Sequence, residues 1–252
     1  MEFDASKIEW LDYDLFEEYS HVIGKTFLRH GGVSKAPFDS LNISDDIGDH
    51  LDAVKLNRER IRAFLKLPHL IFAKQMHGTN IVEITKENVK EVHQADVLCT
   101  KELNIGLVIA HADCQAAIFY DPQKEVIAVA HAGWKGLVQN IYQKVVFYLT
   151  EHFQSKPEDL LVAISPSICP EHAEFKNYKS EIPKDLWSYQ TKPSYFDLWK
   201  IALDQLNLAQ VAKEHIEVAG ICTFCEKKDY YSFRRENKTG RHATVAALFP
   251  RK

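Results

Sequence analysis

Two apolar segments of strand length each end in side chains that can do chemistry. Residues 106–110 lead into His-Ala-Asp-Cys at 111–114, and residues 126–130 lead into His-Ala-Gly-Trp at 131–134. In α/β proteins, polar groups at the end of a buried strand and beside the start of a helix commonly carry function. The segment 105–137 therefore supplies the first candidates for a functional site.

The first hypothesis is a metal site formed by His77, Cys114 and His131, which all lie where an apolar segment gives way to a turn. Zinc in catalytic sites usually has three protein ligands of the His, Cys and carboxylate types and one position open for water. The separations, 114 − 77 = 37 and 131 − 114 = 17 residues, match no short zinc-finger pattern. The residue types support this hypothesis more than the spacing does. A buried thiol with two hydrogen-bonded histidines is the structural alternative.

A second hypothesis uses the same residues without a metal. Cys114 would be a nucleophile, His131 or His77 its base, and Asp113 would orient a histidine. A thiolate at neutral pH needs a cationic neighbour or a helix N-terminus, which the helical pattern starting near Trp134 would supply. The residues alone leave both hypotheses open. A non-catalytic, zinc-stabilised protein that binds a partner is the third interpretation.

Copper oxidase chemistry is excluded by the histidine pattern. Multicopper oxidases hold their copper centres with paired His-x-His motifs. The 12 histidines of this chain include no His-x-His pair. The ligands of a phenol-oxidising copper cluster are therefore missing.

A local basic cluster lies near the C-terminus. Arg234, Arg235 and Arg241 occur close to Ser232 and Thr239 in an otherwise acidic chain. Guanidinium groups hold phosphate or carboxylate in bidentate geometry, so the cluster is a candidate anion site. A solvated charged loop is the alternative.

Two further features are weaker. The Cys-Thr-Phe-Cys segment at 222–225 is a single CxxC, whereas structural zinc sites need two such pairs. We interpret Cys222 as a buried thiol at a strand end and Cys225 as incidental. His111 is either a further ligand or a polar side chain at a strand end.

The bulk properties limit the class of protein. A length of 252 residues suits one large domain, and the net charge of −4 gives no support for a nucleic-acid or membrane-surface partner. No apolar segment approaches the roughly 20 residues that span a bilayer, and the N-terminus lacks a signal pattern. Five scattered cysteines favour reduced thiols. We therefore expect a cytoplasmic protein with one domain over residues 1–252.

The elements that must position these residues follow from apolar periodicity. An N-terminal strand or arm is expected within residues 1–20. Helices are predicted over 50–67, 134–149 and 196–208. Strands are predicted over 21–28, 69–74, 81–84, 95–100, 106–110, 115–120, 126–130, 160–164, 216–221 and 242–248. Many strands with few helices favour a mixed α/β or α+β domain.

These segments resemble one family, the YfiH-like proteins with a so-called laccase domain, also labelled polyphenol oxidases, which include the mammalian protein FAMIN. The matching stretches, in the order of the family, are LRHGGVS (28–34), SLN (40–42), NRERI (57–61), QMHGTNIV (75–82), ADVLCT (95–100), ADCQAAIFYD (112–121), AHAGWKGL (130–137), ISPSICP (164–170) and YYSFRRENKTGR (230–241). HGT, ADC and HAGW together are specific.

The resemblance implies a zinc enzyme with His77, Cys114 and His131 as ligands. The implied fold is an αββα-type sandwich of mixed β-sheets with flanking helices, similar to the catalytic domain of cytotoxic necrotising factor. The implied activity is zinc-dependent purine nucleoside phosphorolysis of adenosine, inosine, guanosine and S-methyl-5′-thioadenosine, with adenosine deamination. Zinc can activate the water that deamination needs.

The partners that follow are purine nucleosides and phosphate, and we expect a monomer or weak homo-oligomer. Arg234, Arg235 and Arg241 suit the phosphate. Further substrate-binding candidates within matching motifs are His30, Asn42 and Arg58. The chain departs from the family pattern at His111, where a small residue or Thr is expected, which leaves its substrate preference open.

Overall fold

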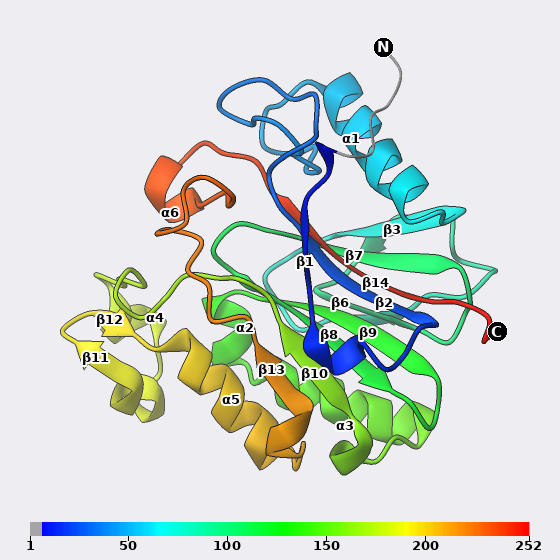
Figure 1. Cartoon of the computed structure of the whole chain (residues 1–252). Helices are drawn as coiled ribbons and strands as arrows, with labels where there is room; N and C mark the ends of the chain where they lie inside the picture. Colours follow the sequence, from blue (N-terminus) through cyan, green and yellow to red (C-terminus); the bar gives the residue numbers. More distant parts are fainter. Residues whose placement is uncertain (1–6, 252) are drawn as a thin grey trace.

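Two six-stranded sheets lie face to face in the computed structural model, which describes residues 7–251 (Figure 1). The first sheet has the order β1-β2-β14-β7-β3-β5, with bounds β1 Trp10–Asp12, β2 Val22–Phe27, β14 His242–Leu248, β7 Ile105–His111, β3 His69–Lys74 and β5 His93–Gln94. The second has the order β13-β10-β8-β9-β6-β4, with bounds β13 Ile216–Val218, β10 Leu161–Ile164, β8 Gln115–Asp121, β9 Val126–Ala132, β6 Val97–Thr100 and β4 Ile81–Glu83. A separate hairpin pairs β11 (Gln190–Lys192) with β12 (Tyr195–Phe196).

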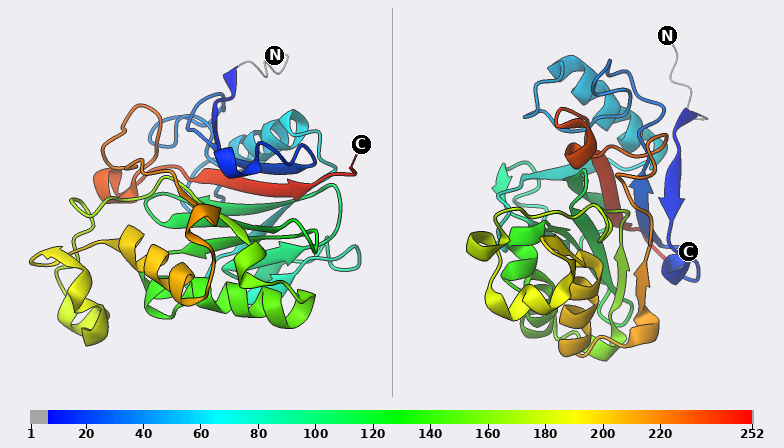
Figure 2. Two further views of the ribbon diagram at one scale, coloured as in Figure 1. Left: turned by 60° about the horizontal axis from the view of Figure 1, so that its bottom comes forward. Right: turned by 90° about the vertical axis from the view of Figure 1, so that its left-hand side faces the viewer.

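Helices cover the outer faces of both sheets, as Figure 2 shows. α1 packs on the first sheet, and α2, α3 and α5 pack on the second. The helices are α1 Leu51–Phe64, α2 Trp134–Val138, α3 Ile141–Phe153, α4 Tyr178–Glu181, α5 Leu198–Leu208 and α6 Phe233–Glu236. Short 3₁₀ helices lie at Asp14–Phe16, Pro157–Asp159, Lys184–Tyr189 and Lys213–His215.

The strand sequences explain these layers because alternate side chains point to opposite faces of a strand. In β9, Ile127 and Val129 lie in the apolar cluster between the sheets, while Ala128 and Ala130 lie in the cluster under the helices. In β7, Leu107 and Ile109 point between the sheets, and Val108 points towards α1. Both central strands are apolar on both faces, as expected for strands covered on both sides. The predicted αββα sandwich of mixed sheets is confirmed.

The chain passes from one sheet to the other at the predicted functional segment. β7 belongs to the first sheet and β8 to the second, and residues 112–114 make the crossing. β8 then pairs antiparallel with β9, with Gln115 opposite Ala132 and Ala116 opposite His131. This register places the end of β9 beside the start of β8.

The structure corrects several predicted bounds. The helix predicted over 134–149 is two helices, because Asn140 adopts a left-handed conformation with φ 58° that interrupts the helix, as asparagine tolerates. α5 begins at Leu198 instead of residue 196, since the Asp197 side chain accepts a hydrogen bond from Lys200 N at 2.8 Å and caps the helix. β13 ends at Val218 instead of residue 221, before Gly220 with φ 65°.

The remaining predictions hold with small shifts. The predicted helix 50–67 is α1, which ends at Phe64, and the strand over 69–74 has the predicted bounds. Of the predicted N-terminal arm, residues 1–6 lie outside the described residues, and β1 pairs antiparallel with β2. Within residues 7–251, no helix is long and apolar enough to cross a membrane.

Candidate metal centre

His77, Cys114 and His131 come together at one end of the two sheets. One ligand atom from each lies within 4.8 Å of the others, and the two imidazole rings are 4.8 Å apart at 89°. The β8–β9 register accounts for Cys114 and His131, which lie 17 residues apart in the chain. His131 is buried, Cys114 is half-buried and His77 is exposed. The cluster is therefore fixed at its base and open at its outer side.

Gln75 extends β3 so that His77 reaches the other two residues. β3 pairs parallel with β7 as far as Phe72 opposite Val108. The Gln75 side chain then donates to Ala110 O and accepts from Ala110 N, both at 2.8 Å. The amide thus continues the ladder between the strands, and the turn that holds His77 is fastened to the end of β7.

Asp96 organises the cluster from below. It precedes β6 and is fully buried. Its Oδ1 accepts hydrogen bonds from His131 Nδ1 and His77 N, both at 2.9 Å, and its Oδ2 accepts from Met76 N at 3.1 Å and Gly78 N at 2.7 Å. Burial alone would raise the pKa of this carboxyl, but hydrogen bonds from His131 and Gly78 outweigh burial and lower it. A charged Asp96 therefore holds the His77 turn and leaves His131 Nε2 for a metal.

The hypothesis that Asp113 orients a histidine is wrong. Asp113 Oδ1 accepts a hydrogen bond from Thr223 Oγ1 at 2.7 Å, and its Oδ2 accepts one from Arg234 N at 2.6 Å. Asp96 has that role instead. Sequence reasoning missed Asp96, although its position as a charged residue directly before a buried strand was a usable signal.

The backbone is held in unusual conformations at the cluster. His77 has φ 57° and Asp113, the neighbour of Cys114, has φ 84°. Left-handed conformations of non-glycine residues are uncommon and concentrate at functional sites. The hydrogen bonds of Asp96 to His77 N and of Thr223 to Asp113 hold these two turns.

The thiol and the imidazole influence each other's charge. Burial alone would raise the pKa of Cys114, but the charge of His131 and hydrogen bonds from His131 and His77 lower it to about 6. Burial alone would lower the pKa of His131, but Cys114 and Asp96 raise it to about 9. The lowered pKa favours the thiolate form of Cys114, which is the form that binds metals.

Gly133 keeps space clear above the three side chains. A Cβ atom at this position would lie 3.1 Å from Cys114 Sγ, 3.3 Å from His77 Cδ2 and 3.8 Å from His131 Cε1. Glycine leaves this volume free because it has no Cβ atom. Two imidazoles, one thiolate and one cleared position fit a zinc ion with an open coordination site.

The three arginines of the predicted anion site differ in their surroundings. Arg235 donates to Thr223 O, Phe224 O, Tyr230 O and Glu236, so its guanidinium is bound within the protein. Exposed Arg234 donates through Nη1 to His172 O at 2.8 Å. Burial lowers the pKa of Arg241, and the charges of Cys114 and two carboxylates, Asp46 and Asp113, oppose this effect. Arg241 is therefore the arginine whose charge reaches the cluster.

Arg241 also keeps donors available. Its Nη1 donates to Thr239 O and Gly240 O, whereas its Nε and Nη2 have no hydrogen-bond partner among residues 7–251. Its backbone N donates to Asn42 Oδ1 at 2.9 Å. The guanidinium is thus held through Nη1 and lies 5.5 Å from the Phe233 ring, while two of its donor atoms keep no hydrogen-bond partner in the described chain.

The other substrate-binding candidates have partners within the protein. His30 Nε2 lies 2.8 Å from Asp229 Oδ1. Buried Asn42 donates to Ser44 O and to Asp49. Arg58 donates to Ile43 O at 2.8 Å, pairs with Asp45 at 3.2 Å and lies over the Phe72 ring. Asn42 positions Arg241, and Arg58 fastens the loop that follows Asn42.

His111 does not join the three ligands. It is buried in β7, and its Nε2 lies 2.8 Å from Thr244 Oγ1 on β14. Burial lowers its pKa well below the usual value. Its ring is a neutral polar group of the sheet.

Cys225, interpreted from the sequence as incidental, has potential metal ligands around it. Cys225 lies with Cys169, His172 and Cys222 in a second group whose ligand atoms are all within 4.8 Å of one another. The two members that sequence reasoning did not connect come from a loop about fifty residues earlier. Cys222 is buried as predicted, but it lies four residues beyond the end of β13.

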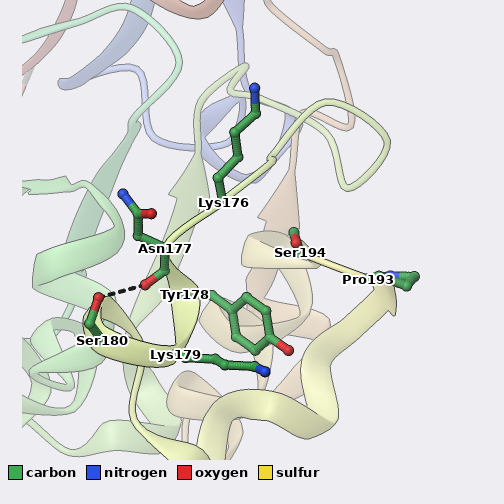
Figure 3. Close-up of a pocket in the computed structure, with 7 residues that line it drawn as sticks. All are labelled: Lys176, Asn177, Tyr178, Lys179, Ser180, Pro193 and Ser194. Carbon is green, nitrogen blue, oxygen red and sulfur yellow. Dashed lines mark hydrogen bonds between the residues drawn. The ribbon is translucent and has the colours of Figure 1, made fainter.

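A surface hollow of about 590 Å³ lies apart from these groups, between α4 and the turn of the β11–β12 hairpin (Figure 3). Lys176 and Lys179 border it, together with Tyr178, and most of its lining residues are exposed. It contains none of the predicted site residues.

Comparison with known proteins places the chain in a family. Residues 24–249 match the family model described as multi-copper polyphenol oxidoreductase laccase. The chain belongs to this family. It is 35% identical over 239 residues to a protein of Bacillus subtilis named purine nucleoside phosphorylase YlmD, covering 87% of this chain and 86% of that protein. It is 30% identical over 231 residues to the Escherichia coli protein named purine nucleoside phosphorylase YfiH, covering 87% and 91%.

Solved structures of the laccase-domain family share the fold. YlmD from Geobacillus stearothermophilus superposes with a TM-score of 0.87 at 29% identity, and covers 96% of each chain. A YfiH protein from Bacillus licheniformis gives 0.87 at 28% identity and covers 98% of each chain. The predicted resemblance to YfiH-like proteins is confirmed.

Proposed function

We propose that this protein is a zinc-dependent purine nucleoside phosphorylase. The observation that carries the proposal is the convergence of His77, Cys114 and His131 over Asp96, in a chain whose relatives are named purine nucleoside phosphorylases. The substrates would be adenosine, inosine, guanosine and S-methyl-5′-thioadenosine. Adenosine deamination would be an accompanying reaction.

Zinc is the metal that the donor set favours. One thiolate and two imidazoles are ligands that zinc takes in catalytic sites, with the fourth position open. The family model is described as a multi-copper laccase, which suggests copper. This chain, however, has no His-x-His pair for a copper cluster. When bound, the zinc ion would supply Lewis-acid activation of water or of a substrate oxygen.

The protein's side chains would hold the ion and leave room for the substrate. His77, Cys114 and His131 would hold the ion, Asp96 would keep His131 in the tautomer with Nε2 free, and Gly133 would leave room for substrate. Exposure of His77 gives a nucleoside access from solvent. In phosphorolysis a phosphate oxygen forms a bond to C1′ of the sugar, the bond from C1′ to the purine nitrogen breaks, and the base leaves with a proton.

Arg241 is the best-placed group for phosphate. Its charge interacts with Cys114 and Asp113, and its Nε and Nη2 have no partner in the described chain. Those two donors can bind a phosphate oxygen pair in fork geometry. Arg234 would add positive charge at the exposed edge, and Arg235 would position the neighbouring backbone. His30, Asn42 and Arg58 would shape the surrounding loops.

A metal-independent Cys–His hydrolase is the second candidate. Without metal, Cys114 and His131 form a thiolate–imidazolium pair, with the pKa of the thiol lowered to about 6 and that of the imidazole raised to about 9 by their mutual attraction, against the effects of burial. Such a pair is the activated form of a cysteine nucleophile. The same geometry therefore supports attack by sulfur when the metal is absent.

The decisive experiment is purine release from adenosine and inosine by purified protein, with and without phosphate. Phosphate-dependent release of adenine and hypoxanthine, with zinc lost from this site in Cys114→Ala, is the expected result. Release independent of phosphate, or none together with rapid alkylation of Cys114 in freshly purified protein, contradicts the proposal and favours the hydrolase. Cys99→Ala is the matched control, because Cys99 is a buried thiol outside both groups.

A further inference from the structure

The second group of ligand atoms comes from two loops with the same internal spacing. Cys169 and His172 are separated by two residues, as are Cys222 and Cys225. Loop 165–172 follows β10, and loop 219–232 runs from β13 towards α6 (Figure 1). The sequence shows only one CxxC, but the fold brings a CxxH against it, which completes the paired pattern typical of structural zinc.

The distances fit a tetrahedral ion. All four ligand atoms lie within 4.8 Å of one another, and His172 Nδ1 is 3.2 Å from Cys169 Sγ and 3.6 Å from Cys225 Sγ. In a tetrahedral site with ordinary Zn–S and Zn–N lengths, sulfur and nitrogen are about 3.5 Å apart. The observed separations bracket this value.

Several contacts hold the four side chains in place. The His172 ring stacks on Phe224, with centroids 4.1 Å apart at 20°, and its Nδ1 faces the sulfurs. Cys169 N donates to Cys222 Sγ at 3.4 Å. The two loops are joined by backbone hydrogen bonds from Ser167 N to Ile221 O and from Thr223 N to Ser167 O. Backbone hydrogen bonds between the two loops thus hold the four side chains close together.

The charge around the group also suits a metal. Three thiolates and a neutral imidazole with a divalent ion carry one net negative charge. Arg235 donates from Nη1 to Thr223 O and Phe224 O, and Arg234 donates to His172 O. Both arginines bind the loops that carry the ligands. Arg235 is also paired with Glu236 at 2.9 Å, and the Glu171 carboxylate lies beside Cys169, so Arg234 is the cation that can offset the excess charge.

A disulfide explains the arrangement less well. Two of the three cysteines could form a disulfide, but a disulfide gives no role to an imidazole nitrogen directed at two sulfurs. Four donors and no carboxylate match closed structural zinc sites of the Cys₃His type. Cys225 is exposed while Cys169 and Cys222 are buried, so an ion can enter from the surface.

We propose that Cys169, His172, Cys222 and Cys225 form a structural zinc site, distinct from the proposed catalytic one. The site fastens both loops behind Cys114. Thr223 Oγ1 donates to Asp113 Oδ1 at 2.7 Å and Ile168 N donates to Asp113 O at 2.9 Å, so each loop holds the residue that precedes Cys114. Binding of this ion stabilises the turn that presents Cys114, the proposed ligand of the first zinc ion.

Zinc counting in variants tests the proposal. Wild type purified with zinc is expected to hold two ions per chain, Cys114→Ala one, Cys225→Ser one, and the double variant none. Cys99→Ala is the matched control and keeps two. Cys114→Ala loaded with Co²⁺ is expected to show two kinds of absorption band. These are the intense visible d–d bands of a tetrahedral ion and the charge-transfer bands from several thiolates to the metal.

Peptide-level alkylation of wild type makes the test independent of variant folding. In zinc-loaded protein, alkylation of Cys169, Cys222 and Cys225 should be slow. Adding a chelator should raise the alkylation rate of each at least tenfold. Metal-free Cys114→Ala, or equal alkylation of Cys225 with and without chelator, overturns the proposal. A disulfide within the group in freshly purified protein also overturns it. Because Cys114→Ala removes only the first ion, failure here is distinguishable from failure of the proposed function.

Discussion

The Oδ1 atom of Asp96 lies 2.9 Å from His131 Nδ1 and accepts a hydrogen bond from it, while the same carboxylate caps the backbone of the His77 turn. One buried side chain therefore fixes two of the three proposed zinc ligands. This arrangement of carboxylate, histidine and metal is a common way to orient a ligand and strengthen its donor nitrogen.

Asp96→Asn should weaken zinc binding by ~10–100-fold, because an amide cannot accept all four hydrogen bonds of the carboxylate. Competition titration with a chromogenic chelator measures the change. Asp121→Asn is the matched control, since Asp121 is also buried and accepts two backbone hydrogen bonds in a turn at the far end of β8. Equal zinc affinity in the two variants would contradict the role of Asp96.

Gly133→Ala should lower zinc affinity and turnover ~10-fold or more, since the added methyl would lie 3.1 Å from Cys114 Sγ. Gly136→Ala in α2 is the matched control, because its methyl would meet only ordinary contacts of 3.4 Å and longer. Zinc titration and steady-state kinetics of both variants check the prediction. Wild-type behaviour of Gly133→Ala would show that the cleared space has no function.

Thr223→Val should destabilise the protein by about 1–3 kcal/mol, because Asp113 Oδ1 would lose its buried donor. Thr223→Ser keeps the hydroxyl and should restore most of the loss. Urea unfolding of zinc-loaded protein gives the free energies. A Ser variant as unstable as the Val variant would indicate that the methyl group, and not the hydrogen bond, matters at this position.

Stability should fall in acid partly through His242. Burial lowers its pKa to about 3, while Tyr231 N donates to its Nε2 at 2.7 Å and its Nδ1 bonds Phe27 O. Since the folded protein holds the neutral form, the unfolded chain binds the proton first, below pH ~6.5. The contribution of neutral His242 to the free energy of unfolding is therefore fully present above pH ~6.5 and is lost as the pH falls towards 3. The full loss is on the order of 5 kcal/mol.

His242→Gln tests that prediction, because glutamine can accept the hydrogen bond from Tyr231 N without titrating. The difference in unfolding free energy between wild type and variant should shrink as the pH falls from 7 to 4, measured with chelator present. The matched control is His152→Gln at an exposed position. A constant difference across this range would show that His242 does not titrate on unfolding.

Most strands, and the residue types of the three proposed zinc ligands, could be predicted from the residues alone, whereas the sandwich class came from the family resemblance. Strand periodicity depends only on neighbouring residues, so residues 69–74 and 242–248 were predicted with their observed bounds. The ligand types at 77, 114 and 131 follow from chemistry at strand ends, together with the family resemblance. Short stretches of sequence are therefore enough to predict strand bounds and to identify candidate ligand types.

How distant side chains meet depends on strand pairing and loop contacts in the folded protein. Asp96 becomes the partner of His131 through the pairing of β6 with β9, and the CxxC at 222–225 meets Cys169 and His172 through backbone bonds between loops fifty residues apart. Asn140 divides a helix whose apolar spacing continues unbroken, because an exposed asparagine in a left-handed conformation leaves no trace in the apolar pattern. Such relationships arise from sheet register and loop docking, which no short stretch of sequence encodes.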